Sequence, residues 1–150
     1  MTDIVQVMES KFEIAAVGYV RSPLADRKNA PRQGNEGAPD VDIEISPEFE
    51  QALDGIETGQ DIWLLTWFHA ADRSTLRVHP RGELHNPEVG VFATRSPDRP
   101  NPIGLHRTVV LDIGKCRLRV QGVEAIDGTP IIDIKPVLGA PESKCHDKHL

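Results

Sequence analysis

The stretch GVFATRSPDRPNPIG, residues 90–104, constrains the fold of this chain most strongly. Each of its three prolines fixes φ and removes a backbone donor, and each pushes the preceding residue toward extended geometry. The stretch is therefore predicted to be neither a helix nor a central strand. We expect a stiff, irregular loop that holds Arg95, Arg99 and Asn101 in fixed directions. Loops of this length are usually functional or disordered; the apolar flanks argue against disorder, and a rigid connector whose arginines pair with surface carboxylates is the alternative.

Composition bounds the class of protein. The 150 residues suffice for one domain with a sizeable core, and hydrophobic and charged fractions of 39% and 27% are ordinary for a soluble protein. No run approaches the length of a membrane span, and the N-terminal sequence MTDIVQVMES lacks the basic start of a signal peptide. These features predict a cytoplasmic protein with no membrane partner, in which Cys116 and Cys145 are reduced thiols.

The charge pattern bears on nucleic-acid binding. The formal net charge of −6 argues against DNA or another polyanion bound over a broad basic surface. Arginines nevertheless concentrate between positions 73 and 107. They are either a local basic face or solvated charges that balance acidic neighbours.

Short apolar or alternating segments separated by turn residues predict a mainly-β fold with one or two short helices. The clearest helix should start at Pro47, run to Leu53 and stop at Gly55. Residues 24–40 and 70–90 are expected to be loops. Because βαβ units are absent, a single β-barrel-like domain over residues 1–150, with its core at about 12–137, is favoured over a doubly wound sheet. The expected strands are residues 12–20, 41–45, 61–68, 108–113, 116–123 and 131–134.

Two local patterns carry further expectations about the core. Gly114-Lys115 is predicted to be a hairpin turn, and Cys116 is expected on the apolar side of the next strand. Asp133 shares its predicted strand face with Ile131, so it needs a partner such as Lys135 or an arginine.

The motifs of common catalytic folds are absent from the sequence. It has no GxGxxG or GxxxxGK[ST] for nucleotides, no GxSxG elbow and no HExxH pair. His69, at the end of the predicted strand 61–68, is either a cofactor contact or proton acceptor, or a cap of the strand end. At the tail, Cys145, His146 and His149 are either metal ligands or incidental residues, and we expect no metal.

Five segments follow one another along the chain: Pro31-Arg32-Gln33, Trp67-Phe68-His69, Val78-His79-Pro80-Arg81, the proline loop and DGTPIIDIKP at residues 127–136. Taken together, they resemble the TsaA/TrmO-like family, also called YaeB-like, in its short form. The resemblance covers residues 12–137 and implies a β-barrel methyltransferase that binds S-adenosylmethionine near the subunit interface of a homodimer. It further implies tRNA as substrate, with N6-methylation of threonylcarbamoyladenosine next to the anticodon.

The resemblance also implies which residues form the cofactor site. In that site Arg95 would grip the cofactor carboxylate, and Glu124 would bond the ribose hydroxyls. No catalytic base is assigned. The alternatives are a methyltransferase for a different substrate and a non-catalytic S-adenosylmethionine-binding regulatory protein. The implied site residues are Pro31, Arg32, Gln33, His69, Ala70, Arg95, Leu105, Gln121, Gly122, Val123 and Glu124.

Overall fold

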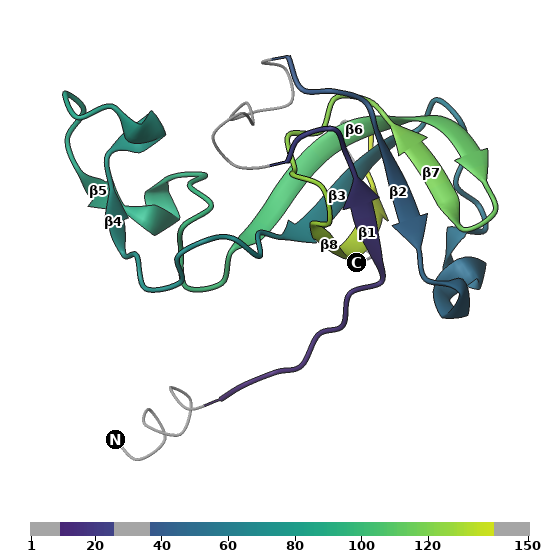
Figure 1. Ribbon diagram of the computed structural model, residues 1–150, viewed down its shortest axis with the longest axis horizontal. Coiled ribbons are helices and arrows are strands. Elements are labelled where there is room, and N and C mark those ends of the chain that lie inside the picture. Colours follow the sequence, from purple (N-terminus) through teal and green to yellow (C-terminus); the bar gives the residue numbers. More distant parts are fainter. Residues whose placement is uncertain (1–9, 26–36, 140–150) are drawn as a thin grey trace, which may run out of the picture.

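The computed structural model describes residues 10–25 and 37–139, and its core is a six-stranded antiparallel sheet that closes on itself (Figure 1). The strands pair in the order β1-β2-β7-β6-β3-β8, and β8 pairs back with β1. The mainly-β class predicted from the sequence is confirmed. The six strands are β1 (Gly18–Arg21), β2 (Val41–Ile45), β3 (Asp61–Trp67), β6 (Ile103–Gly114), β7 (Arg117–Val120) and β8 (Pro130–Pro136).

The alternation of side chains builds the interior of the barrel. On β2, the apolar residues of the VDIEI sequence are buried, as the alternation predicts, whereas Asp42 and Glu44 lie on the outer face. On β3, Ile62, Leu64 and Thr66 point inward, and Thr66 is the polar member of that inward face. Branched aliphatic side chains from all the barrel strands fill the core.

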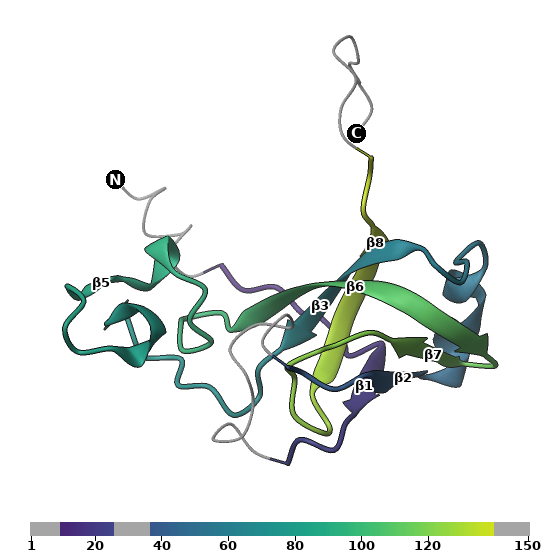
Figure 2. The same ribbon diagram turned by 90° about the horizontal axis from the view of Figure 1, so that it is seen from above.

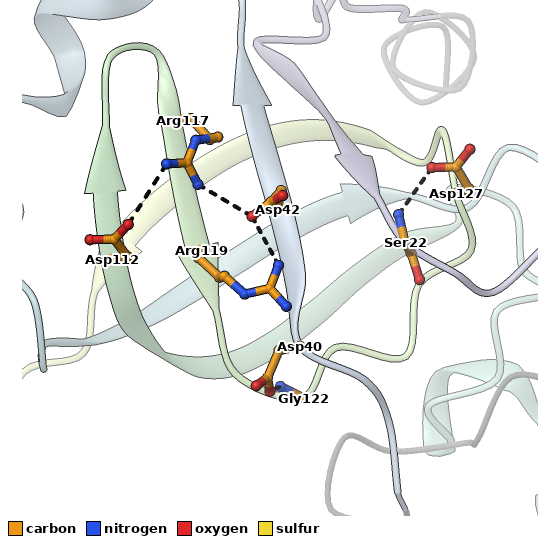
Figure 3. A network of polar contacts seen from close by, with 8 residues as sticks. All are labelled: Ser22, Asp40, Asp42, Asp112, Arg117, Arg119, Gly122 and Asp127. Carbon is orange, nitrogen blue, oxygen red and sulfur yellow. Dashed lines mark hydrogen bonds and ion pairs between the residues drawn. The ribbon is translucent and has the colours of Figure 1, made fainter.

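Ion pairs on the outer face link β2 to the β6–β7 hairpin (Figure 3). Asp42 Oδ1 lies 3.4 Å from Arg117 Nη1 and 3.1 Å from Arg119 Nη1. Arg117 Nη2 also lies 3.7 Å from Asp112 Oδ2. These side chains are a third or more exposed, so each pair adds about 1 kcal/mol at most.

A short helix follows β2 at the predicted place. It is a 3-10 helix, η3 (Pro47–Leu53), with proline at its start, and Gly55 after it has a φ of 99°. Phe49 and Leu53 pack against the barrel core. No helix in residues 10–25 and 37–139 has the length and apolar character that a membrane crossing requires.

An arm extends from the barrel between β3 and β6, where the sequence predicted only loop. It contains two paired strands, β4 (Arg77–Val78) and β5 (Val89–Gly90). Figures 1 and 2 both show β4 and β5 beyond the end of the barrel. A 3-10 turn, η4 (Pro80–Gly82), lies between these two strands, and a second, η5 (Val91–Ala93), follows β5. The proline stretch therefore contains one helical turn, contrary to the prediction, and is irregular from Thr94 to Pro102.

Three predicted strand boundaries are wrong. β1 begins at Gly18, because β2 is only long enough to pair with Gly18–Arg21, and Phe12 is 89% exposed. β6 begins at Ile103, five residues before the predicted start, where it pairs with Trp67. Cys116 lies in the hairpin turn at a φ of 54° and is partly exposed, so it is not a core residue.

A bulge in β8 overturns the predicted face of Asp133. Ile131 pairs with Thr66 and Asp133 pairs with Leu65, so the alternation shifts between these positions. Ile131 stays in the core, whereas Asp133 turns to the outer face. Its expected partner is present there, since Lys135 Nζ lies 3.1 Å from Asp133 Oδ2.

Candidate functional site

A groove of about 1750 Å³ lies where the barrel meets the arm. Its lining comes from the first half of β3, the residues that follow β3, the first half of β6, the arm, the proline loop and the segment after β7. Pockets for single small ligands span roughly 300–1,000 Å³, so this groove has room for a ligand and a second molecule beside it. The described lining of a smaller hollow of about 520 Å³, beside η3, includes none of the residues predicted for the site.

The groove gathers most of the predicted site residues from four distant segments. Val123 does not line it, because its side chain is fully buried in the core. Pro31-Arg32-Gln33 lies outside the described residues, as do Cys145, His146 and His149. Within the described ranges, no three His, Cys, Asp or Glu side chains cluster as metal ligands. The predicted residues that line the groove are His69, Ala70, Arg95, Leu105, Gln121, Gly122 and Glu124.

Arg99 determines the shape of the proline loop. Its Nη1 donates to the carbonyl oxygens of Thr94 and Ser96 at 3.0 Å each, and its Nη2 donates to that of Val91 at 2.7 Å. The guanidinium therefore binds three backbone carbonyls of a segment whose prolines supply few amide donors of their own. Arg99 thus holds the wall of the groove that carries Arg95.

A second arginine fastens the proline loop to the end of β3. The guanidinium of Arg73 lies 5.0 Å from the ring centre of Trp67, the last residue of β3. It also donates to the Pro100 carbonyl at 2.7 Å and to Asn101 Oδ1 at 3.1 Å. Asn101 therefore helps to anchor the loop.

Asp72 adds a third fastening between the same two segments. Its amide donates to Asp98 Oδ1 at 2.9 Å. Its own carboxylate accepts hydrogen bonds from the Ser74 hydroxyl and amide, which hold the pKa of Asp72 below its ordinary value. The loop is thus a fixed wall, as its prolines predicted.

We expect Arg99→Lys to loosen this wall without unfolding the barrel. Lysine keeps the charge but cannot span three carbonyls with a planar fork. Losing about two hydrogen bonds of roughly 1 kcal/mol each should speed amide exchange in residues 91–99 about tenfold or more. Hydrogen-exchange mass spectrometry measures this, with Arg119→Lys on the outer barrel face as the matched control. Equal protection in the two variants would contradict the role assigned to Arg99.

Arg95 and Leu105 meet across the groove. Arg95 Nη2 donates to the Leu105 carbonyl at 3.1 Å, and both residues line the groove. A guanidinium has five donors in a fixed fork, so this bond orients Arg95 and leaves donors for an anionic ligand. Leu105 itself is 41% exposed and presents an apolar surface beside that charge.

The segment after β7 is fastened from both sides. Asp40 Oδ1 accepts from the Gly122 amide at 2.9 Å (Figure 3). The Thr108 hydroxyl donates to the Gln121 carbonyl, and the Val123 amide donates to the Pro39 carbonyl at 2.9 Å. This irregular segment therefore has a defined course along the groove.

The sequence analysis missed the hydrogen bonds that link three polar side chains at the groove floor, those of Thr66, His106 and Glu124. His106 is 4% exposed; its Nε2 lies 2.8 Å from Thr66 Oγ1 and its Nδ1 lies 2.7 Å from Glu124 Oε1. The signal lay in the alternation of residues 104–110, which places His106 and Thr108 on the same inward face as Val110. Because the strand was predicted to begin at Thr108, His106 was left outside that pattern.

Comparison with known proteins identifies the family of this chain. The model of the tRNA-methyltransferase O N-terminal domain family matches residues 19–141. A "Probable S-adenosyl-L-methionine-binding protein" of Methanothermobacter thermautotrophicus is 46% identical over 128 residues, which cover 85% of this chain and 91% of that protein. An "S-adenosyl-L-methionine-binding protein" of Archaeoglobus fulgidus is 43% identical over 129 residues, 86% of this chain and 90% of that protein.

A solved structure adds the fold to the comparison. The crystal structure of TrmO from Pseudomonas aeruginosa aligns with a TM-score of 0.70 at 31% identity. The alignment covers 91% of this chain but 61% of that one, so this chain spans less than two thirds of that TrmO protein. With the family model matching most of its length, the chain belongs to the tRNA-methyltransferase O N-terminal domain family.

Proposed function

We propose that the protein binds S-adenosylmethionine in the groove and acts as an S-adenosylmethionine-dependent methyltransferase. The observation that carries this proposal is the convergence on one groove of His69, Arg95, Leu105 and Glu124 from separate segments. Membership of the family and the names of the two archaeal relatives support it. When bound, the cofactor supplies a methyl group activated by its sulfonium.

The groups along the groove fit the parts of this cofactor. The Arg95 fork suits the methionine carboxylate, and the exposed faces of Ile103 and Leu105 suit the adenine ring. Glu124, whose side chain is 16% exposed, offers carboxylate oxygens to the ribose hydroxyls. The residues thus bind and orient the cofactor, and alignment of donor with acceptor supplies much of the rate.

We further propose tRNA as the methyl acceptor, with N6 of threonylcarbamoyladenosine next to the anticodon as the modified atom. The groove has room for a nucleoside beside the cofactor. Arg77, Arg81 and Arg107 also line it and bring guanidinium groups to the phosphates of an RNA loop despite the acidic net charge. Arg77 pairs with Glu88 at 3.2 Å and Arg107 pairs with Asp61 at 3.0 Å, so RNA would compete with these exposed ion pairs. Such a substrate places the reaction in the cytoplasm.

A homodimer completes the proposal. The arm and the proline stretch present Leu84 and Phe92, which are 81% and 83% exposed. Contact with a second copy of the chain would remove such large apolar side chains from water. A second copy of the chain would cover Leu84 and Phe92 and close the groove. Sedimentation velocity measures the mass in solution and should give that of two chains.

Mass spectrometry of tRNA nucleosides tests the substrate. Cells that lack the gene should lose the methylated form of threonylcarbamoyladenosine, and the wild-type gene should restore it. An unchanged nucleoside profile would refute the tRNA assignment. Binding of the cofactor without transfer to any RNA would then favour a regulatory S-adenosylmethionine-binding protein, and transfer to another acceptor would favour a different substrate.

A further inference from the structure

His106 lies on the groove floor between two polar partners, and the proposed function gives it no role. It stands on β6, while Thr66 is on β3 and Glu124 is in the irregular segment after β7. The distances are 2.8 Å from Nε2 to Thr66 Oγ1 and 2.7 Å from Nδ1 to Glu124 Oε1. Thr66 and His106 are both buried, so the imidazole is shielded from water and bonds to protein groups on its two sides.

The chemistry of the partners fixes the direction of these hydrogen bonds. An ionised carboxylate only accepts, so the proton on Nδ1 of His106 is donated to Glu124. In the neutral imidazole Nε2 then accepts, and the Thr66 hydroxyl is its donor. Glu124 thereby selects the tautomer protonated at Nδ1, and the Thr66 hydroxyl, which can donate or accept, satisfies Nε2.

The imidazole ring is also held in place by its surroundings. The ring of Phe68 meets it edge to face, with centroids 5.8 Å apart and an angle of 82°. Gly104, two residues before His106, leaves the space that the Phe68 ring and the Thr66 hydroxyl occupy. A ring confined in this way presents its Nδ1 in one direction.

Glu124 lies in an irregular segment rather than in a strand, so the direction of its side chain depends on the hydrogen bond from His106. The backbone just before it is fixed through Asp40 and Thr108, but those contacts do not reach the Glu124 side chain. The hydrogen bond from His106 engages Oε1, and the carboxylate keeps further acceptor sites for a ligand. Acidic residues bind ribose hydroxyls in this manner in dinucleotide sites.

We propose that His106 is a positioning residue that orients Glu124 to accept hydrogen bonds from the ribose of the cofactor, an inference that rests on the proposed function. Thr66 holds the other side of the imidazole through its hydrogen bond to Nε2. A supporting shell of this kind keeps a binding group in its productive geometry.

Calorimetric titration of the full chain with S-adenosylhomocysteine and its 2′-deoxy and 3′-deoxy analogues tests this role. The wild-type protein should bind the parent ligand about tenfold more tightly than at least one deoxy analogue, since a hydrogen bond to a charged group is lost. In His106→Asn the amide nitrogen stands near the position of Nδ1, so the discrimination should survive. In His106→Gln the amide stands near Nε2 instead, and the discrimination should fall to about twofold or less.

A second pair keeps the test decisive if His106→Gln fails to fold in thermal denaturation. Thr66→Val removes the hydroxyl that bonds to Nε2 and should reduce the discrimination, whereas Thr66→Ser keeps the hydroxyl and should retain it. Equal discrimination by Asn and Gln at position 106, or by Val and Ser at position 66, would overturn the positioning role. A wild-type protein that binds all ligands equally would overturn it too, with the proposed function intact; no binding at all would overturn both.

Discussion

Replacing Gly104 with alanine should lower the free energy of unfolding by about 2–3 kcal/mol, the upper part of the range of about 1–3 kcal/mol for overfilling a packed core. A Cβ atom there would lie 2.4 Å from Thr66 Oγ1 and 2.5 Å from Phe68 Cζ. Thr66 is fully buried and bonded to His106, so it has little room to retreat. Urea denaturation measures the change, and binding of S-adenosylmethionine should weaken with it because the groove floor moves.

Gly90→Ala is the matched control for this substitution. The nearest atom to a Cβ at Gly90 is the Leu76 carbonyl oxygen at 3.9 Å, an ordinary contact. Its φ of −66° suits alanine, so its stability should change by about 0.5 kcal/mol at most. If Gly104→Ala were as stable as Gly90→Ala, the close packing of β3 on β6 at the groove would be refuted.

Arg95→Ala should weaken binding of S-adenosylmethionine more than tenfold. The guanidinium is proposed to grip the cofactor carboxylate, and hydrogen bonds between charged groups contribute about 1.5–3 kcal/mol, against roughly 1.4 kcal/mol for a factor of ten. The Leu105 carbonyl loses its donor in the same variant, which loosens that edge of the groove. Calorimetry measures the dissociation constant.

Two further variants make the Arg95 result specific. Arg119→Ala removes an arginine that pairs with Asp42 on the outer barrel face, and it should leave cofactor binding unchanged. Arg95→Lys keeps the charge without the planar fork, so its affinity should fall between the wild type and Arg95→Ala. An Arg95→Ala protein that binds as tightly as Arg119→Ala would exclude Arg95 from the cofactor site.

Elements specified by local sequence were predicted well. The alternation in VDIEI determines β2, and the proline after Ser46 starts η3, because both signals act within a few residues. The prediction of a stiff proline loop likewise used only residues within that loop. Its internal fastening by Arg99 was left open, since a bond to Val91 depends on how the loop turns back on itself.

The failures came from features that depend on partner strands. The bulge near Ile131 that turns Asp133 outward arises where β8 pairs with β3, and nothing in DGTPIIDIKP marks it. Pro102 and Gly104 are residue types typical of turns, so the sequence placed the start of β6 too late. The inward position of His106 was missed for this reason. The groove residues in segment 121–124 followed from the family resemblance, because an irregular segment has no periodicity to read.

The most direct measurement is a calorimetric titration of the wild-type chain with S-adenosylmethionine. Saturable binding of one cofactor per chain is predicted, with the affinity reduced by Arg95→Ala and unaffected by Arg119→Ala. Absence of binding by the wild-type protein at millimolar cofactor would contradict the assignment of the groove as a cofactor site.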